Sequence, residues 1–177
     1  MGSRAIPHEV MLFCSILYNS KDSADQAAAE LKKAYGKTAY ESQPYPFTYT
    51  SYYEKEMGSS LQRIIVAFEN LVPRNALPDV KTLTNDIEEK LAIEGKRSVN
   101  MDPGILSLEN ICLATTKPYS HRIYLDKGIW AEVTLMYRKD SYQGLAWTYP
   151  DYASPELTNM FNFLRDLYKE RSRCRGV

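Results

Sequence analysis

The residues most able to do chemistry lie in the second half of the chain, where acids, cations and a histidine are closely spaced. Asp102 and Glu132 each supply a carboxylate, and His121 supplies an imidazole, which ordinarily titrates near neutral pH. Lys117 and Arg122 are cations that could hold a carboxylate or phosphate group. These types provide general-acid, general-base and anion-binding groups. His121, Asp102 and Glu132 are therefore the candidate catalytic residues, although the pattern identifies no reaction.

A predicted hairpin brings several of these side chains together. Residues 111–125 and 129–137 have strand-like sequences, and Asp126-Lys127-Gly128 between them fits a three-residue hairpin loop. Arg122, oriented by Glu132, could bind an anion, or the two could form an ordinary cross-strand salt bridge, which is more common. Likewise, His121 could act in catalysis or could be a satisfied core histidine. The predicted register opposes Tyr124 to Trp130, Arg122 to Glu132 and Ser120 to Thr134 on one face, with His121, Ile123, Ala131 and Val133 on the other.

Two further polar positions precede this hairpin. A strand over residues 97–105 is predicted to end in the turn Asp102-Pro103-Gly104, which places Asn100 and Asp102 on one face. Asp102 could hold a ligand at the strand end, or it could only cap the turn. Lys117, after the polar break Thr115-Thr116, could meet an anion or guard an edge strand.

Aromatic residues are concentrated in two segments, 45–53 and 147–152. Such segments can line a ligand pocket or a protein interface, because tyrosine combines a large apolar area with a polar tip. They can also form a packing seam, which we favour for the residues before Pro46. We favour the pocket or interface for residues 147–152. The complete predicted ligand-binding set is Asn100, Asp102, Lys117, Ser120, His121, Arg122, Glu132, Tyr149 and Asp151.

The common cofactor motifs are missing from the sequence. It contains no glycine-rich phosphate loop, no zinc-protease helix and no hydrolase elbow. With only two histidines, a multi-histidine metal site is excluded. A divalent metal held mainly by oxygen ligands stays open, with Asp102, Glu132 or Asp151 as its ligands.

The composition is that of an ordinary globular protein with an excess of tyrosine. The 177 residues include 22 basic and 22 acidic side chains and 14 tyrosines, so the formal net charge is zero. This balance argues against nucleic-acid binding through bulk electrostatics, and the basic end of the chain, residues 165–175, fits a solvated helix terminus better. No apolar run approaches the ~18 residues of a membrane helix. Three cysteines without CxxC spacing indicate reduced thiols and a cytoplasmic protein.

The order of predicted elements indicates an α+β fold. Strands over residues 10–18, 37–43, 61–71 and 97–105 alternate with helices over 22–36 and 78–93. This β-α-β-β-α-β order predicts a ferredoxin-like split βαβ core over about residues 10–105, with an antiparallel sheet and both helices on one face. An extension over about 106–172 adds the hairpin, an aromatic loop over 142–152 and a helix opened by Ser154-Pro155-Glu156. We expect one domain over residues 1–177.

Several long motifs resemble one protein family over most of the chain, from about residue 11 to 171. They are QPYPFTYTSYYEKEMG, VNMDPGILSLENICLATTKPYSHRIYL, GIWAEVTL and WTYPDY. In these motifs the chain resembles the prokaryotic family of domain of unknown function 4416. The resemblance implies a cytoplasmic bacterial or archaeal protein and carries no established activity. One departure is Ile105, where an aromatic residue is more usual, which argues against ring stacking there.

Two functions remain after these considerations. The first is binding of a small anionic ligand, nucleotide- or phosphate-like, in a polar site bordered by the tyrosine-rich loops. The second is a non-enzymatic interaction module that uses the aromatic loops as its contact surface. Nucleic-acid binding ranks last, a membrane is not an expected partner, and the oligomeric state stays open.

Overall fold

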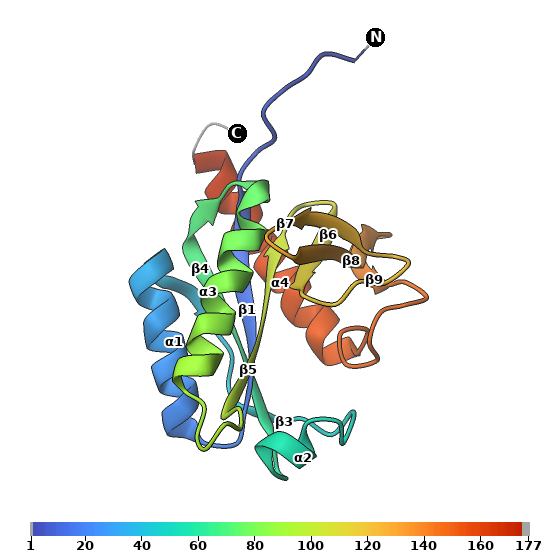
Figure 1. The fold of residues 1–177 in the computed structure, drawn as a ribbon. Helices are drawn as coiled ribbons and strands as arrows, with labels where there is room; N and C mark the ends of the chain where they lie inside the picture. Colours follow the sequence, from blue (N-terminus) through green and yellow to red (C-terminus); the bar gives the residue numbers. More distant parts are fainter. Residues whose placement is uncertain (1, 175–177) are drawn as a thin grey trace.

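A computed structural model describes residues 2–174 of the chain, and the fold is mixed α+β (Figure 1). Nine strands, four α-helices and a short 3₁₀ helix alternate along these residues. None of the helices in this range is long and apolar enough to span a membrane. The elements are β1 Val10–Tyr18, α1 Lys21–Tyr35, β2 Thr38–Glu41, β3 Tyr45–Pro46, α2 Glu54–Met57, β4 Gln62–Val72, η1 Arg74–Ala76, α3 Leu77–Lys90, β5 Val99–Leu106, β6 Asn110–Thr115, β7 Ile123–Asp126, β8 Ile129–Arg138, β9 Ser141–Gly144 and α4 Pro155–Cys174.

The strands form a single antiparallel sheet in the order β2-β4-β1-β5-β6-β8-β7, with β3 paired to β4 and β9 paired to β8. The expected α+β class and antiparallel sheet are confirmed. The expected ferredoxin-like arrangement is not, because the sheet has nine strands rather than the four of that core. The hairpin extension joins the same sheet through β5 and β6.

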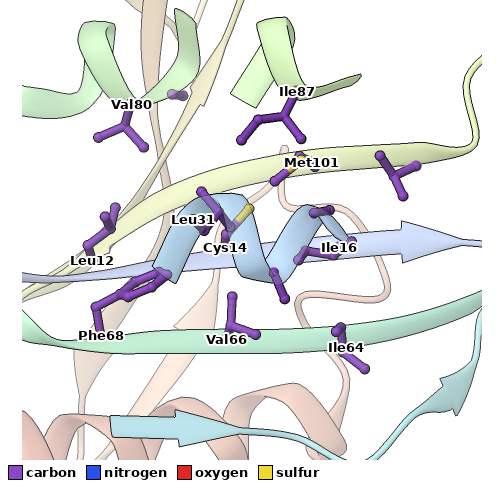
Figure 2. Close-up of a cluster of buried hydrophobic side chains, with 14 of the residues drawn as sticks. Leu12, Cys14, Ile16, Leu31, Ile64, Val66, Phe68, Val80, Ile87 and Met101 are labelled. Carbon is purple, nitrogen blue, oxygen red and sulfur yellow. The ribbon is translucent and has the colours of Figure 1, made fainter. Parts of the chain in front are cut away.

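Helices cover both faces of the central strands. All nine residues of β1 are buried, since its alternate side chains enter two different cores. On one face, Leu12, Cys14 and Ile16 pack with α1 and α3 (Figure 2). On the other face, Phe13 packs edge-on against Phe161 of α4, with ring centroids 5.0 Å apart. The sheet is therefore the middle of three layers, as Figure 1 shows.

Several predicted boundaries agree with the structure. The strand over 10–18 is confirmed, and α1 begins one residue before Asp22 and ends before Gly36, whose φ is 86°. Ser154 caps α4 as predicted, because its Oγ accepts the N–H of Leu157 at 3.2 Å. The predicted loop over 142–152 is wrong at its start, where β9 pairs with β8.

The predicted turn at Asp102-Pro103-Gly104 is wrong, because β5 continues through it to Leu106. Gly104 and Pro103, which suggested the turn, are explained instead by packing and by strand pairing. A Cβ on Gly104 would lie 2.5 Å from the ring of Phe13, so glycine permits close packing of β5 on β1. On the N-terminal side of Gly104, residues 99–103 of β5 have no pairing with β6, and proline is tolerated at such an edge.

Two side chains of α3 take the place of the missing strand at this edge. Lys81 Nζ donates to the Met101 carbonyl at 2.7 Å, and Glu88 Oε1 accepts the Met101 N–H at 2.6 Å. The backbone polar groups of residues two apart in a strand point to the same edge, so the nitrogen of Pro103 points to the same edge as the backbone groups of Met101. No neighbouring strand in the described part of the chain needs an N–H donor there, and proline, which has none, is tolerated. Both polar groups of Met101 are thus satisfied without a neighbouring strand.

The predicted hairpin is correct in the strand pairing next to its loop, and wrong in the length of the loop and in the residues further back. Tyr124 opposes Trp130 as predicted, but the loop is the two residues Lys127 and Gly128, with φ of 52° and 75°. Residues 116–122 leave the sheet, so Ser120 does not pair with Thr134. The alternation used for the hairpin does not apply to these residues.

Replacing Lys81 by methionine will destabilise the protein strongly. The variant keeps the length of the side chain but removes the donor to Met101 and leaves Glu88 without its ammonium, 4.0 Å away. We expect the free energy of unfolding in urea to fall by about 3 kcal/mol. Lys90→Met is the matched control on the same helix, because Lys90 is 65% exposed in its pair with Glu30 and its loss will cost less than about 1 kcal/mol. Equal losses in the two variants would contradict the role of Lys81 at the edge.

Glu88 gives the stability a measurable pH dependence. Burial raises the pKa of its carboxyl above the ordinary 4.5, despite the opposing charge of Lys81. Between 4.5 and the raised pKa, the folded state holds a proton that the unfolded state releases, so stability falls as pH rises. In urea titrations at a series of pH values above 4.5, the stability of wild type minus that of Glu88→Gln will decrease with pH. A difference that rises with pH in this window would show that the folded pKa is lowered instead.

Candidate functional site

Polar side chains gather on the face of the sheet that α4 covers, near the end of β1. Ser15 on β1 lies opposite Asp102 on β5. Leu17 lies between Arg63 of β4 and Asn100 of β5. Directly opposite residues of neighbouring strands share a face, so these polar groups border one another.

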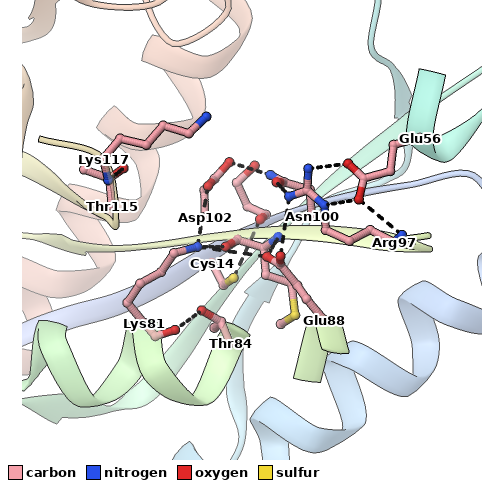
Figure 3. Close-up of polar contacts among 12 residues, drawn as sticks. Cys14, Glu56, Lys81, Thr84, Glu88, Arg97, Asn100, Asp102, Thr115 and Lys117 are labelled. Carbon is pink, nitrogen blue, oxygen red and sulfur yellow. Dashed lines mark hydrogen bonds and ion pairs between the residues drawn. The ribbon is translucent and has the colours of Figure 1, made fainter. Parts of the chain in front are cut away.

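Asn100 connects Asp102 to Arg97 in a hydrogen-bonded row (Figure 3). Its Nδ2 donates to Asp102 Oδ2 at 2.9 Å, and its Oδ1 accepts from Arg97 Nη1 at 2.8 Å. Arg97 also donates to both carboxylate oxygens of Glu56, at 2.8 and 2.6 Å, and these bonds lower the pKa of Glu56. On its other side, Asp102 lies 3.9 Å from the ammonium of Lys81. The sequence placed Asn100 and Asp102 on one face correctly, but it gave no sign of Lys81.

Asp151 forms a buried ion pair with Arg63. The two charged atoms are 2.7 Å apart, and the side chains are only 7% and 5% exposed. The guanidinium lies 4.5 Å from the ring centroid of Phe47 and 5.6 Å from that of Tyr152. Asp151 therefore anchors the aromatic loop after β9 to strand β4. The sequence analysis missed Arg63, whose only signal was a single cation inside the apolar run of residues 61–71.

Glu132 holds both His121 and Arg122. Its Oε2 lies 2.9 Å from His121 Nε2 and accepts Arg122 Nε, also at 2.9 Å, while its buried Oε1 has no hydrogen-bond partner in the described residues. The interaction of Arg122 with Glu132 was anticipated. The predicted placement of His121 on the opposite face is wrong, because His121 precedes β7 and its ring turns toward Glu132. That ring also stacks on Trp147 at 5.1 Å.

Lys117 lies where the loop after β6 meets the first aromatic segment. Its Nζ is 5.3 Å from the centroid of the Tyr52 ring, and its carbonyl accepts Arg122 Nη1 at 2.9 Å. Within residues 2–174 its ammonium makes no ion pair. Ser120 and Tyr149 are exposed, and the hydroxyl of Ser120 has no hydrogen bond in the same part of the chain.

Tyr53 joins these groups into one region. Its ring lies 5.1 Å from that of Tyr52 and 5.9 Å from the Arg97 guanidinium. Burial raises the pKa of the Tyr53 hydroxyl, and the charge of Asp102 raises it further. The aromatic segment over residues 45–53 therefore borders both Lys117 and the Asn100–Asp102 row. The other aromatic segment borders the hairpin through Trp147 and His121.

The described residues offer no ligand set for a metal ion. No group of three or more His, Cys, Asp or Glu side chains lies close enough together in residues 2–174. Asp151 and Glu132 instead have cationic partners, and Asp102 lies beside Lys81. A surface pocket next to the first aromatic segment contains none of the nine predicted binding residues. It is lined by Pro46, Phe47, Thr48, Thr50, Ser51, Glu54, Ser60, Leu61 and Gln62.

Comparison with known proteins places the chain in a family without assigning it an activity. No curated protein and no solved structure matches the chain. A family model described as a domain of unknown function, DUF4416, matches residues 8–168, which include all nine predicted binding residues. The chain therefore belongs to the DUF4416 family.

Proposed function

We propose that the protein binds a small ligand that carries an anionic group, and that Lys117 holds this group. The observation that carries the proposal is the unpaired ammonium of Lys117 above the exposed ring of Tyr52. An ammonium that makes no internal ion pair keeps its three donors for a carboxylate or phosphate. The adjacent Tyr52 ring adds apolar area on which the rest of a ligand can pack.

The other cations of the region support the site without binding the anion. Arg63, Arg97 and Arg122 each pair with a carboxylate of the chain, at 2.7, 2.6 and 2.9 Å. A ligand could recruit one of them only by breaking a pair that is at least partly buried, which is costly. Arg122 acts as a positioning residue for Lys117, because it bonds the Lys117 carbonyl while Glu132 fixes its guanidinium.

A second candidate function is a protein-interaction module. Its support is the number of exposed apolar side chains on the loops and the hairpin. An interface enriched in tyrosine and tryptophan would use such a surface. These side chains are Tyr49, Tyr52, Tyr119, Ile123, Tyr124, Trp147 and Tyr149, with exposed fractions between 40% and 69%.

We also propose that β2, β4, β1 and β5 with α1 and α3 constitute a ferredoxin-like unit to which the remaining strands were added. The strand order and the common face of the two helices support it.

We further propose that the protein is located in the cytoplasm of a prokaryote. Its support is the sequence resemblance and the free thiols of Cys14 and Cys112. Arg175 and the side chain of Cys174, which belong to the basic end noted above, lie outside the described residues.

Thermal unfolding in the presence of small anions tests the binding proposal. The probes are inorganic phosphate, ribose 5-phosphate, AMP and citrate, which separate phosphate from carboxylate recognition. A probe that binds the folded state at 100 times its Kd adds about 2.7 kcal/mol of stability and raises the unfolding temperature. We expect Lys117→Gln to reduce that rise strongly while leaving the unfolding temperature of the free protein unchanged, because its ammonium makes no ion pair in residues 2–174.

Lys169→Gln is the control for this experiment. Lys169 is an exposed lysine on α4, so its removal lowers the charge equally without touching the site. A loss of binding in both variants would indicate non-specific attraction to positive charge. No response to any probe, together with an oligomer that dissociates on dilution, would favour the interaction module.

A further inference from the structure

We propose that the ligand also carries hydroxyl groups, as a phosphorylated sugar or polyol does, and that Asp102 accepts their hydrogen bonds. This inference rests on the proposed binding of an anionic group by Lys117. It assigns Asp102 a direct contact with the ligand and defines the class of ligand beyond its charge.

The surroundings of Asp102 leave acceptor positions open. Asn100 Nδ2 takes one position on Oδ2, and the ammonium of Lys81 lies 3.9 Å from Oδ1, beyond hydrogen-bond distance. A carboxylate has about four lone-pair sites and no donor when ionised. The side chain is 35% exposed, so a ligand can reach the remaining sites.

The charge balance around Asp102 favours neutral donors. A second anionic group of the ligand would be repelled by the carboxylate, so a polyanion fits poorly. A ligand ammonium would gain less binding energy here than at an isolated carboxylate, because the positive charge of Lys81 lies 3.9 Å from Asp102 and would repel it. Hydroxyl groups donate a hydrogen bond without adding charge. They therefore suit a carboxylate whose negative charge is already balanced by a nearby cation, here Lys81.

The positions of Lys117 and Asp102 suit a single small molecule. Gly104 opposes Leu113 in the last pair of β5 with β6, and Asp102 lies two residues before Gly104 in β5. Lys117 follows Leu113 by four residues, in the segment that leaves the sheet after β6. Figure 3 shows the side chains of Lys117 and Asp102 on the same side of β5. The Tyr53 ring contacts the ring of Tyr52, which lies beside Lys117, and the charge of Asp102 acts on the Tyr53 hydroxyl.

Two matched phosphates test the assignment. Glycerol 3-phosphate and propyl phosphate share the anionic group, and only the first has hydroxyl groups. Calorimetric titration of wild type is expected to show about tenfold tighter binding of glycerol 3-phosphate, or about 1.4 kcal/mol. Asp102→Asn will bring the two affinities to within about twofold of each other, because the single amide oxygen is the acceptor that Asn100 Nδ2 requires, and a hydrogen bond between a hydroxyl and the neutral amide is weaker than one to a carboxylate. Lys117→Gln will weaken both phosphates by a similar factor and keep their ratio.

The outcomes separate this inference from the function on which it rests. Asp86→Asn, a change at an exposed position of α3, is the control and should leave the ratio at the wild-type value. Equal binding of both phosphates by wild type, or an unchanged ratio in Asp102→Asn, would overturn the assignment of Asp102 while Lys117 still binds phosphate. Stronger competition by glycine than by acetate would also overturn it, since the two share a carboxylate and the difference would indicate an ammonium at Asp102. If neither of these two phosphates binds, and none of inorganic phosphate, ribose 5-phosphate, AMP and citrate binds either, both proposals are wrong.

Discussion

The divergence of β6 from β5 after Leu113, which leaves β5 unpaired at this edge before Gly104, determines how the polar residues of this protein are arranged. A buried strand edge with unpaired backbone groups would be costly, and Lys81 and Glu88 remove that cost by bonding both groups of Met101. The desolvation of these two charges is offset only in part, by their separation of 4.0 Å and by Arg97, which lies 3.5 Å from Glu88. With the edge satisfied from the helix side, the chain after β6 can leave the sheet. Residues 116–122 then cross to the aromatic segment, where Lys117 meets Tyr52.

The opposite edge of the region depends on a second buried charge. Arg63 reaches Asp151 between the rings of Phe47 and Tyr152, which shield the pair from water. An ion pair at this depth contributes less to net stability than its short distance suggests, because desolvation opposes the attraction. Its larger effect is on position: an alternative path of the loop after β9 would leave a charge buried without a partner. The loop is thereby fixed next to the hairpin, where Trp147 stacks on His121.

Sequence reasoning succeeded where one local pattern decides the structure. The apolar run of β1, the cap at Ser154 and the pairing of Tyr124 with Trp130 are each determined by neighbouring residues. It failed at Asp102-Pro103-Gly104, where residues typical of a turn lie inside strand β5. Pro103 is tolerated because β6 is not paired with β5 at this position, and Gly104 is required by the close ring of Phe13. It also misplaced His121, since strict alternation holds only while the strand stays paired. Lys81 and Arg63 were missed because a buried cation is recognisable only from partners distant in sequence, and no local pattern contains them.

The pairing of charges restricts the ligands that this region can take. Neutralising a nucleic-acid backbone requires several free cations, one for each phosphate contacted. Here Arg63, Arg97 and Arg122 are committed to carboxylates of the chain, and the ammonium of Lys117 makes no such pair in residues 2–174. The committed charges hold the surrounding side chains in one geometry, so little reorganisation is needed when a ligand arrives. A lysine without an internal ion pair in the described residues, set among arginines that are already paired, matches a small ligand with a single anionic group, and the zero net charge of the whole chain is consistent with that use.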